Sequence, residues 1–167
     1  MQYSPDSHGV VLRPIEMRDQ KAMARLIRSV FEEYEAPMTG TVYDDPRTWH
    51  IFETITNQNA GYWVLIQDDI VAGGCGFYPT EGLPSGYAEL VKFYLSPIIR
   101  GKGYGTKLFL HVIEQARKSG YKNLYIESFP EFNAAVSMYR RNGFKEIPER
   151  LGNSGHTSTT IHMAKEL

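Results

Sequence analysis

Apolar residues recur three to four positions apart near the start of the chain, a spacing typical of one face of a helix. The positions concerned are Ala22, Met23, Leu26, Ile27, Val30, Phe31 and Tyr34. They follow Asp19, a residue type that caps helices, and a short β-rich run at residues 10–13 comes before them. Asp45 and Pro46 form a typical helix start, which predicts a second helix to about Asn57.

Three β-rich runs follow, at residues 62–67, 70–78 and 87–95. Only Asp68 and Asp69 separate the first two, which indicates a tight hairpin. We therefore expect three neighbouring antiparallel strands in the middle of the chain. The segments before Asp45 and after Tyr78 are loops that we expect to shape a binding pocket.

The last third of the chain returns to alternating helices and strands. Apolar pairs predict a helix that ends near Gly120, and residues 124–128 form the next strand. We expect Asn133 to cap a helix through Tyr139, followed by strands near residues 144–147 and 159–164. The order βααβββαβαββ predicts an α/β fold in which a mixed, mostly antiparallel sheet carries helices on its faces. Because no linker or repeat interrupts residues 1–167, we expect a single domain.

Composition removes several classes of function. Lysine and arginine total 18 against 19 aspartates and glutamates, a net charge of −1, which excludes a generally basic nucleic-acid binder. Cys75 is the one cysteine and the five histidines show no zinc-site spacing, so we expect neither a disulfide nor a metal. No apolar run approaches the ~20 residues of a membrane span. We expect a cytoplasmic protein that contacts no membrane.

Arg100-Gly101-Lys102-Gly103-Tyr104-Gly105 lies between a predicted strand and a predicted helix. Glycines allow close approach of a ligand to the main chain, and the first amides of a helix attract phosphate oxygens. An ordinary flexible turn is the competing interpretation. The P-loop pattern fails, because Thr106 precedes Lys107, and the dinucleotide pattern fails because position 106 is not glycine.

The remaining pattern, R-x-x-G-x-G at Arg100, Gly103 and Gly105, resembles the GNAT superfamily of acyl-CoA-dependent N-acetyltransferases. A second segment resembles that family too: residues 133–139 begin with asparagine and end with tyrosine, and Gly-Phe follows at 143–144. The resemblance implies the family's fold from about residue 10 to the end. It also implies acetyl-CoA as the acyl donor and an amine as the acceptor.

The resemblance further implies where acetyl-CoA binds. The strand before the glycine turn would splay from its neighbour and bind the pantetheine arm, as in strand addition. The pyrophosphate would lie over the amides of the turn, and a backbone N–H near Tyr94 or Leu95 would polarise the thioester. Asn133 would contact the cofactor arm, although a helix cap needs no ligand. The expected cofactor-binding residues are Phe93, Tyr94, Leu95, Arg100, Gly101, Lys102, Gly103, Tyr104, Gly105, Thr106 and Asn133.

Two residues are candidates for proton transfer. Tyr139 is at the position of the family's general acid, and its alternative role is packing on the sheet. Glu89 lies in an otherwise apolar strand, where a carboxylate needs water or a function, and it resembles the strand base of some family members. Alternation places Glu89 on the same face as Tyr87, Val91 and Phe93, and a solvent-facing strand end is the competing interpretation.

Other positions admit a structural explanation first. Glycines 73, 74 and 76 indicate a bulge, a close approach by substrate or a twisted edge, and we expect Cys75 to be a small buried hydrophobe. We favour structural roles for His156 and His162. We expect Arg140 and Arg141 either to approach the ribose phosphate of CoA or to be simply exposed helix-end residues.

The function predicted from these features is transfer of an acetyl group from acetyl-CoA to a primary amine by direct attack. The amine belongs to a small molecule, an amino acid or a peptide. The alternative is a catalytically silent CoA-binding or sensing module. The sequence is compatible with a homodimer.

Overall fold

The computed structural model describes residues 3–56 and 58–167, so the expected end of the second helix at Asn57 lies outside the described residues. The strands are β1 (Val10–Pro14), β2 (Gly61–Gln67), β3 (Ile70–Tyr78), β4 (Tyr87–Leu95), β5 (Asn123–Ser128), β6 (Lys145–Glu146) and β7 (Ile161–Glu166). The α-helices are α1 (Gln20–Glu33), α2 (Ile51–Ile55), α3 (Tyr104–Lys118) and α4 (Asn133–Arg141). Short 3-10 helices are η1 (Met17–Asp19), η2 (Pro46–His50), η3 (Pro97–Ile99) and η4 (Pro130–Phe132). The predicted order of helices and strands is confirmed.

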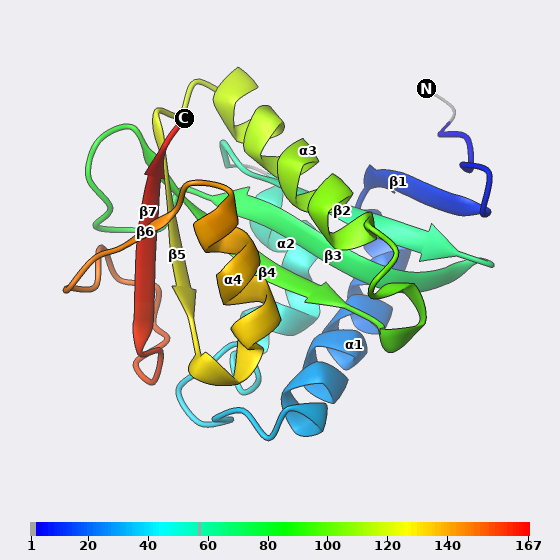
Figure 1. Ribbon diagram of the computed structural model, residues 1–167, viewed down its shortest axis with the longest axis horizontal. Helices are drawn as coiled ribbons and strands as arrows, with labels where there is room; N and C mark the ends of the chain where they lie inside the picture. Colours follow the sequence, from blue (N-terminus) through cyan, green and yellow to red (C-terminus); the bar gives the residue numbers. More distant parts are fainter. Residues whose placement is uncertain (1–2, 57) are drawn as a thin grey trace.

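The described strands form one seven-stranded sheet in the order β1-β2-β3-β4-β5-β7-β6. β4 and β5 are parallel, and every other neighbouring pair is antiparallel. Helices α3 and α4 lie in front of the sheet in Figure 1, and α1 and α2 lie behind it. The predicted mixed, mostly antiparallel sheet with helices on both faces is confirmed.

Each face of the sheet has its own apolar core. Leu108, Phe109 and Val112 of α3 pack with sheet residues on one face, and Met23 and Ile27 of α1 pack on the other. These are the helical repeats that the apolar pattern predicts, and burial of each such side chain contributes about 1.5–3 kcal/mol. Both helices are therefore held by tertiary packing of one face.

The hairpin between β2 and β3 turns at Asp68 and Asp69, with φ values of 50° and 61°. Two-residue hairpin turns with positive φ at both positions match the twist of the strands they join. The tight hairpin expected from the sequence is confirmed.

β4 contains an irregularity that the sequence pattern does not reveal. Gly76 pairs with Val91 and Gly74 pairs with Tyr94, so two β4 residues lie opposite Cys75. Lys92, one of the two, has a φ of 51°. A bulge of this kind exchanges the faces of the residues beyond it. Phe93 therefore packs in the core on the α3 side of the sheet, and its expected place on the face of Glu89 is wrong.

Gly74 is what allows this bulge. A Cβ there would lie 2.6 Å from the Tyr62 hydroxyl and 2.7 Å from the Met23 sulfur. Because glycine has no Cβ, the Tyr62 ring can cross β3 at this point. Its hydroxyl donates to the Lys92 carbonyl oxygen at 2.6 Å. The register shift between Gly74 and Gly76 confirms the bulge interpretation, and because β3 lies inside the sheet the twisted-edge interpretation is wrong.

Candidate active site

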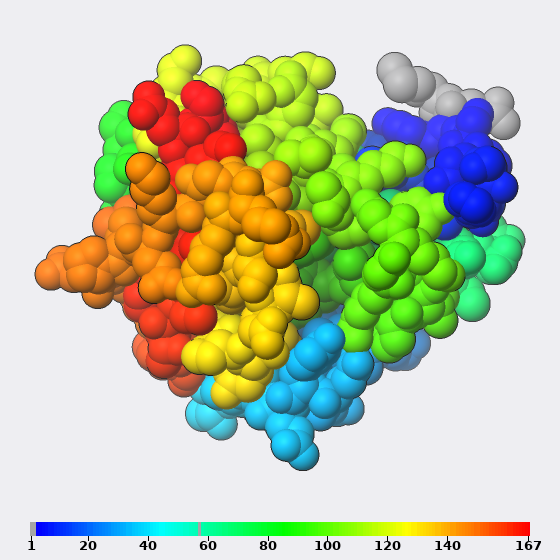
Figure 2. Space-filling view, viewed as in Figure 1, coloured from blue at the N-terminus to red at the C-terminus, as the bar shows by residue number. Residues whose placement is uncertain are grey.

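A cavity of about 560 Å³ follows β4 from its middle to the glycine turn before α3. Figure 2 shows the surface hollowed where the yellow and orange α4, the green turn and the blue end of α1 meet. We call the part beside the turn the turn end, lined by Phe93, Leu95, Gly101, Gly103, Gly105, Thr106 and Tyr139. We call the other part the charged end, lined by Arg47, Thr80, Glu89, Lys92, Ser154 and His156.

The cavity exists because β4 and β5 separate. Their parallel pairing covers only Tyr87, Ala88 and Glu89 of β4, opposite residues 123–125. Beyond Glu89 the β4 main chain has no β5 partner in the described sheet, while its other edge stays paired with β3. This geometry is suited to an extended ligand that adds to the free edge. The splay expected before the glycine turn is confirmed.

The turn before α3 has the backbone of an anion site. Gly101 and Gly103 have φ values of 71° and 84°, and a Cβ on either would meet no atom within 4 Å. A Cβ on Gly105 would lie 2.8 Å from Leu95, so this glycine allows α3 to approach β4. Lys107 N–H donates to the Gly103 carbonyl oxygen as a first helical bond, and the preceding amides of the helix start need another acceptor.

Two side chains of the turn are directed away from the cavity. Lys102 Nζ donates to the Ile98 carbonyl oxygen at 2.8 Å, and Tyr104 Oη donates to Asp6 Oδ2 at 2.9 Å. Neither residue lines the cavity. Any contact of Lys102 or Tyr104 with a ligand in the cavity is therefore left to the main chain.

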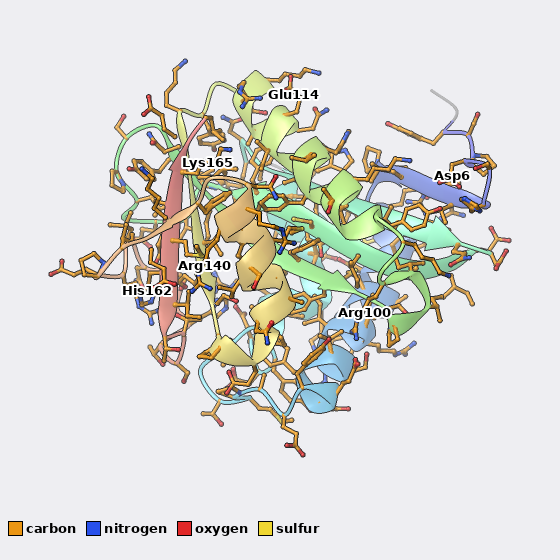
Figure 3. All side chains as sticks on the ribbon, viewed as in Figure 1. Asp6, Arg100, Glu114, Arg140, His162 and Lys165 are labelled. Carbon is orange, nitrogen blue, oxygen red and sulfur yellow. The ribbon has the colours of Figure 1, made fainter. Side chains whose placement is uncertain are left out.

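Arg100 is held by the end of α1. Its terminal nitrogens donate to the two carboxylate oxygens of Glu33 at 2.7 and 2.9 Å, and Nε donates to the Leu95 carbonyl oxygen at 3.0 Å. Figure 3 shows Arg100 beside α1. The arginine of the sequence motif thus fixes the turn against α1, and its contact with phosphate stays a prediction.

Tyr139 lines the turn end, and only 5% of its surface is exposed. Its ring packs against Phe93 and Phe109, with centroids 6.2 and 5.5 Å away. Burial raises the pKa of the Tyr139 hydroxyl well above its ordinary value, so the group keeps its proton at neutral pH. Tyr139 therefore both packs in the core and lines the cavity.

Asn133 does not fit its expected place. It is the first residue of α4, Phe132 occupies the cap position, and the helix start has no side-chain cap bond. The expected cap by Asn133 is therefore wrong, because η4 runs directly into α4. Asn133 borders a separate surface depression beside Ser137, whereas Ala134, Ala135 and Met138 of α4 face the cavity.

Glu89 is the buried acid of the charged end, with 5% of its surface exposed. Thr80 Oγ1 donates to its Oε2 at 2.5 Å. Burial, and then the nearby Glu127 carboxylate, raise the pKa of Glu89 to about 7, although Thr80 and Lys92 act in the opposite direction. Its carboxylate thus exchanges a proton near neutral pH, as general bases do. The competing interpretation, a solvent-facing strand end, is wrong.

Three segments close the charged end. Thr80 comes from the loop after β3, as expected, whereas Arg47 comes from η2, the predicted start of the second helix, and not from the loop before Asp45. The third segment, the loop between β6 and β7, brings Ser154 and His156, and the sequence pattern does not reveal it. Arg47 Nη2 donates to the Ser154 carbonyl oxygen at 2.8 Å, and His156 Nε2 lies 2.8 Å from Asp45 Oδ2. The favoured structural role of His156 is confirmed, but the residue also lines the cavity.

The structure also shows the surroundings of Cys75, Arg140 and Arg141. Cys75 is fully buried, which confirms the expected small buried hydrophobe, and burial raises the pKa of its thiol. Arg140 pairs with Glu146, whereas the exposed Arg141 lines the cavity. Among residues 3–56 and 58–167, no three His, Cys, Asp or Glu side chains are grouped to hold a metal ion. No helix in the same ranges is long and apolar enough to cross a membrane.

Comparison with known protein families identifies the family of this chain. The Acetyltransferase (GNAT) family matches residues 24–144, from α1 through the glycine turn to the end of α4. The chain belongs to the GNAT acetyltransferase family. It is accordingly an acyltransferase that takes an acetyl group from acetyl-CoA. The resemblance of the two sequence motifs to this family is confirmed.

Several individual proteins are similar to this GNAT chain. It is 36% identical over 158 residues to the uncharacterized N-acetyltransferase YjgM of Escherichia coli, covering 94% of this chain and 95% of the relative. It is 31% identical to N-acetyltransferase 8B of Rattus norvegicus over 94 residues, which cover 55% of this chain and 42% of the relative.

Solved structures share the GNAT fold. A GNAT acetyltransferase of Staphylococcus aureus has a TM-score of 0.80 at 18% identity, covering 94% of this chain and 98% of its own. The PaiA N-acetyltransferase of Thermoplasma acidophilum, solved in complex with coenzyme A, has a TM-score of 0.69 at 18% identity, with 95% and 99% coverage.

Proposed function

We propose that this domain, residues 1–167, transfers acetyl groups to a primary amine by direct attack, without a covalent enzyme intermediate. The observation that carries the proposal is the arrangement along β4. One strand presents a buried carboxyl with a pKa near neutrality, then a free main-chain edge, and then a glycine turn at a helix start. Acetyl-CoA supplies the acetyl thioester.

The turn end fits the acyl donor. The free edge of β4 beyond Glu89 offers main-chain groups at Phe93, Tyr94 and Leu95. Amides at the entrance of α3 have no intrahelical acceptor, and no side chain of the described residues caps them, so they offer donors for a pyrophosphate, with Thr106 beside them. Arg141, exposed at the cavity, adds a positive charge. Asn133 has no place in this proposal, because it borders a different depression.

Two side chains move protons. An alkyl ammonium has a pKa near ~10, so it must lose a proton before it attacks. Glu89 accepts that proton, because its own pKa of about 7 leaves a large fraction ionised at neutral pH. Tyr139 keeps its proton until the thiolate departs, and then donates it to the sulfur. Both groups line the same cavity.

Release of free thiol tests the proposal. The protein is incubated with acetyl-CoA and a panel of amino acids, alkylamines, polyamines and peptides, and CoA thiol is followed with time. We expect release that depends on the amine and a matching N-acetylated product. Tight binding of CoA without turnover for any amine would instead identify a silent CoA-binding module.

A cytoplasmic location, where the thiol of Cys75 stays reduced, is part of the proposal.

A further inference from the structure

Lys92 introduces a positive charge that the proposed proton transfers do not use. The bulge gives it a φ of 51° and places it in the lining of the charged end. Its main-chain carbonyl is fixed by Tyr62, but no hydrogen bond or ion pair reaches its ammonium from any of the described residues. Burial lowers the pKa of Lys92, while the Asp45 and Glu89 carboxylates act to raise it and Arg47 lowers it. Lys92 is only partly buried, and an ammonium that lines a cavity without a partner among the described residues favours an anionic ligand over a cationic one.

Asp45, one neighbouring carboxylate, is already compensated. Its oxygens accept hydrogen bonds from the Arg47 guanidinium at 2.7 and 3.1 Å, and His156 Nε2 lies 2.8 Å from Oδ2. Burial acts to raise the pKa of Asp45, but the bonds from His156 and Arg47 outweigh it and hold the pKa far below its ordinary range. Asp45 therefore stays ionised, and its charge is offset by Arg47.

Glu127, the second carboxylate, is compensated in the same way. Tyr125 Oη donates to its Oε2 at 2.8 Å, and the Ser154 hydroxyl donates to Oε1. Arg150 Nη1 lies 3.3 Å from Oε2. Each of the two carboxylates thus has its own arginine, and neither is free to neutralise Lys92.

The charges that remain are those of Lys92 and Glu89. With a pKa of about 7, Glu89 is largely protonated below neutrality and becomes protonated again whenever it takes the acceptor's proton. Once Glu89 is protonated, the charged end carries one uncompensated positive charge, which a plain amine leaves without a counter-charge. A monoanionic group on the acceptor would restore the balance, whereas a dianionic phosphate would exceed it beside Glu89 and Glu127.

We propose that the acceptor is an amine that also carries a carboxylate, an amino-acid-like molecule whose carboxylate binds the Lys92 ammonium. Arg47 offers the carboxylate a further hydrogen-bond donor, because its Nη1 makes no hydrogen bond with the described residues, although its Nε and Nη2 are bound. This inference rests on the proposed function and names its acceptor class.

Matched pairs of acceptors that differ only in the carboxylate test the inference. Glycine is compared with methylamine, β-alanine with ethylamine, 4-aminobutyrate with propylamine, and L-tyrosine with tyramine, in the thiol-release assay. Charge-assisted hydrogen bonds predict that, in at least one pair, kcat/KM is about 10- to 100-fold higher for the acid, mainly through a lower KM.

Variants of Lys92 separate recognition from folding. K92M keeps the length of the side chain and removes its charge, so we expect a folded enzyme in which kcat/KM falls further for the acid than for the plain amine of the same pair, which removes the preference. K92R should retain a preference. The inference would be overturned if wild type accepted acid and amine equally. It would also be overturned if K92M lost the same fraction of kcat/KM with both members of every pair while transfer itself persisted. Absence of turnover with every amine would overturn the proposed function, and this inference with it.

Discussion

Replacing Glu89 by glutamine should lower activity and raise stability at the same time. The amide oxygen of Gln can still accept the Thr80 hydroxyl, so the main change is loss of a titrating charge. A carboxyl whose pKa is raised on folding binds its proton more tightly in the native state. Wild type therefore loses stability as the pH rises from about 4.5, the ordinary value, to about 7, the value in the fold.

The expected size follows from these two pKa values. A difference of one pH unit corresponds to about 1.4 kcal/mol, so the ionised Glu89 costs about 3 kcal/mol when the pH is well above 7. Between pH 5 and pH 8, E89Q should gain about 2.5 kcal/mol in free energy of unfolding relative to wild type. Its kcat/KM should fall, and the acidic limb of the wild-type pH profile should be lost.

Urea unfolding followed by circular dichroism at pH 5, 6, 7 and 8 measures the stability difference, and thiol release measures activity over the same range. E166Q is the matched control, because Glu166 is an exposed glutamate in β7. The predicted effect is the part of the pH-dependent stability difference of E89Q that E166Q does not share. A stability difference for E89Q that does not change with pH would refute the raised pKa, and an unchanged pH profile of activity would refute the role as base.

Three further variants test the rest of the site. Y139F should lower kcat by about 100-fold or more with unchanged CoA affinity in calorimetry, and full turnover would remove the acid role. G103E should raise the Kd for CoA more than about tenfold, because it places a carboxylate where the pyrophosphate binds. G120E is its control, since both glycines have positive φ and open space, and equal affinity of the two variants would contradict the placement. Y62F should lower the free energy of unfolding by about 1–3 kcal/mol, because the buried Lys92 carbonyl loses its donor; urea unfolding measures this, and wild-type stability would mean that the bond does not hold the bulge.

The order of helices and strands could be predicted from the sequence, because each depends on neighbours three or four positions away in helices and two positions away in strands. The glycine turn also has a local cause, since Gly101 and Gly103 occupy the left-handed backbone region that glycine adopts without strain. The place of Tyr139 beside the cavity was implied by the resemblance to the GNAT family and not by any property of the tyrosine itself.

The sequence by itself determined the elements, the turn and the acidic strand position, whereas the tertiary structure decided which side chains meet in the charged end. The alternation of β4 fails at Lys92 because a hydroxyl 30 positions earlier reaches its carbonyl across Gly74. Asp45 and His156 meet although 111 positions separate them. Contacts between distant segments are fixed by packing of the whole sheet, and a pattern with a period of two or 3.6 residues contains no information about them.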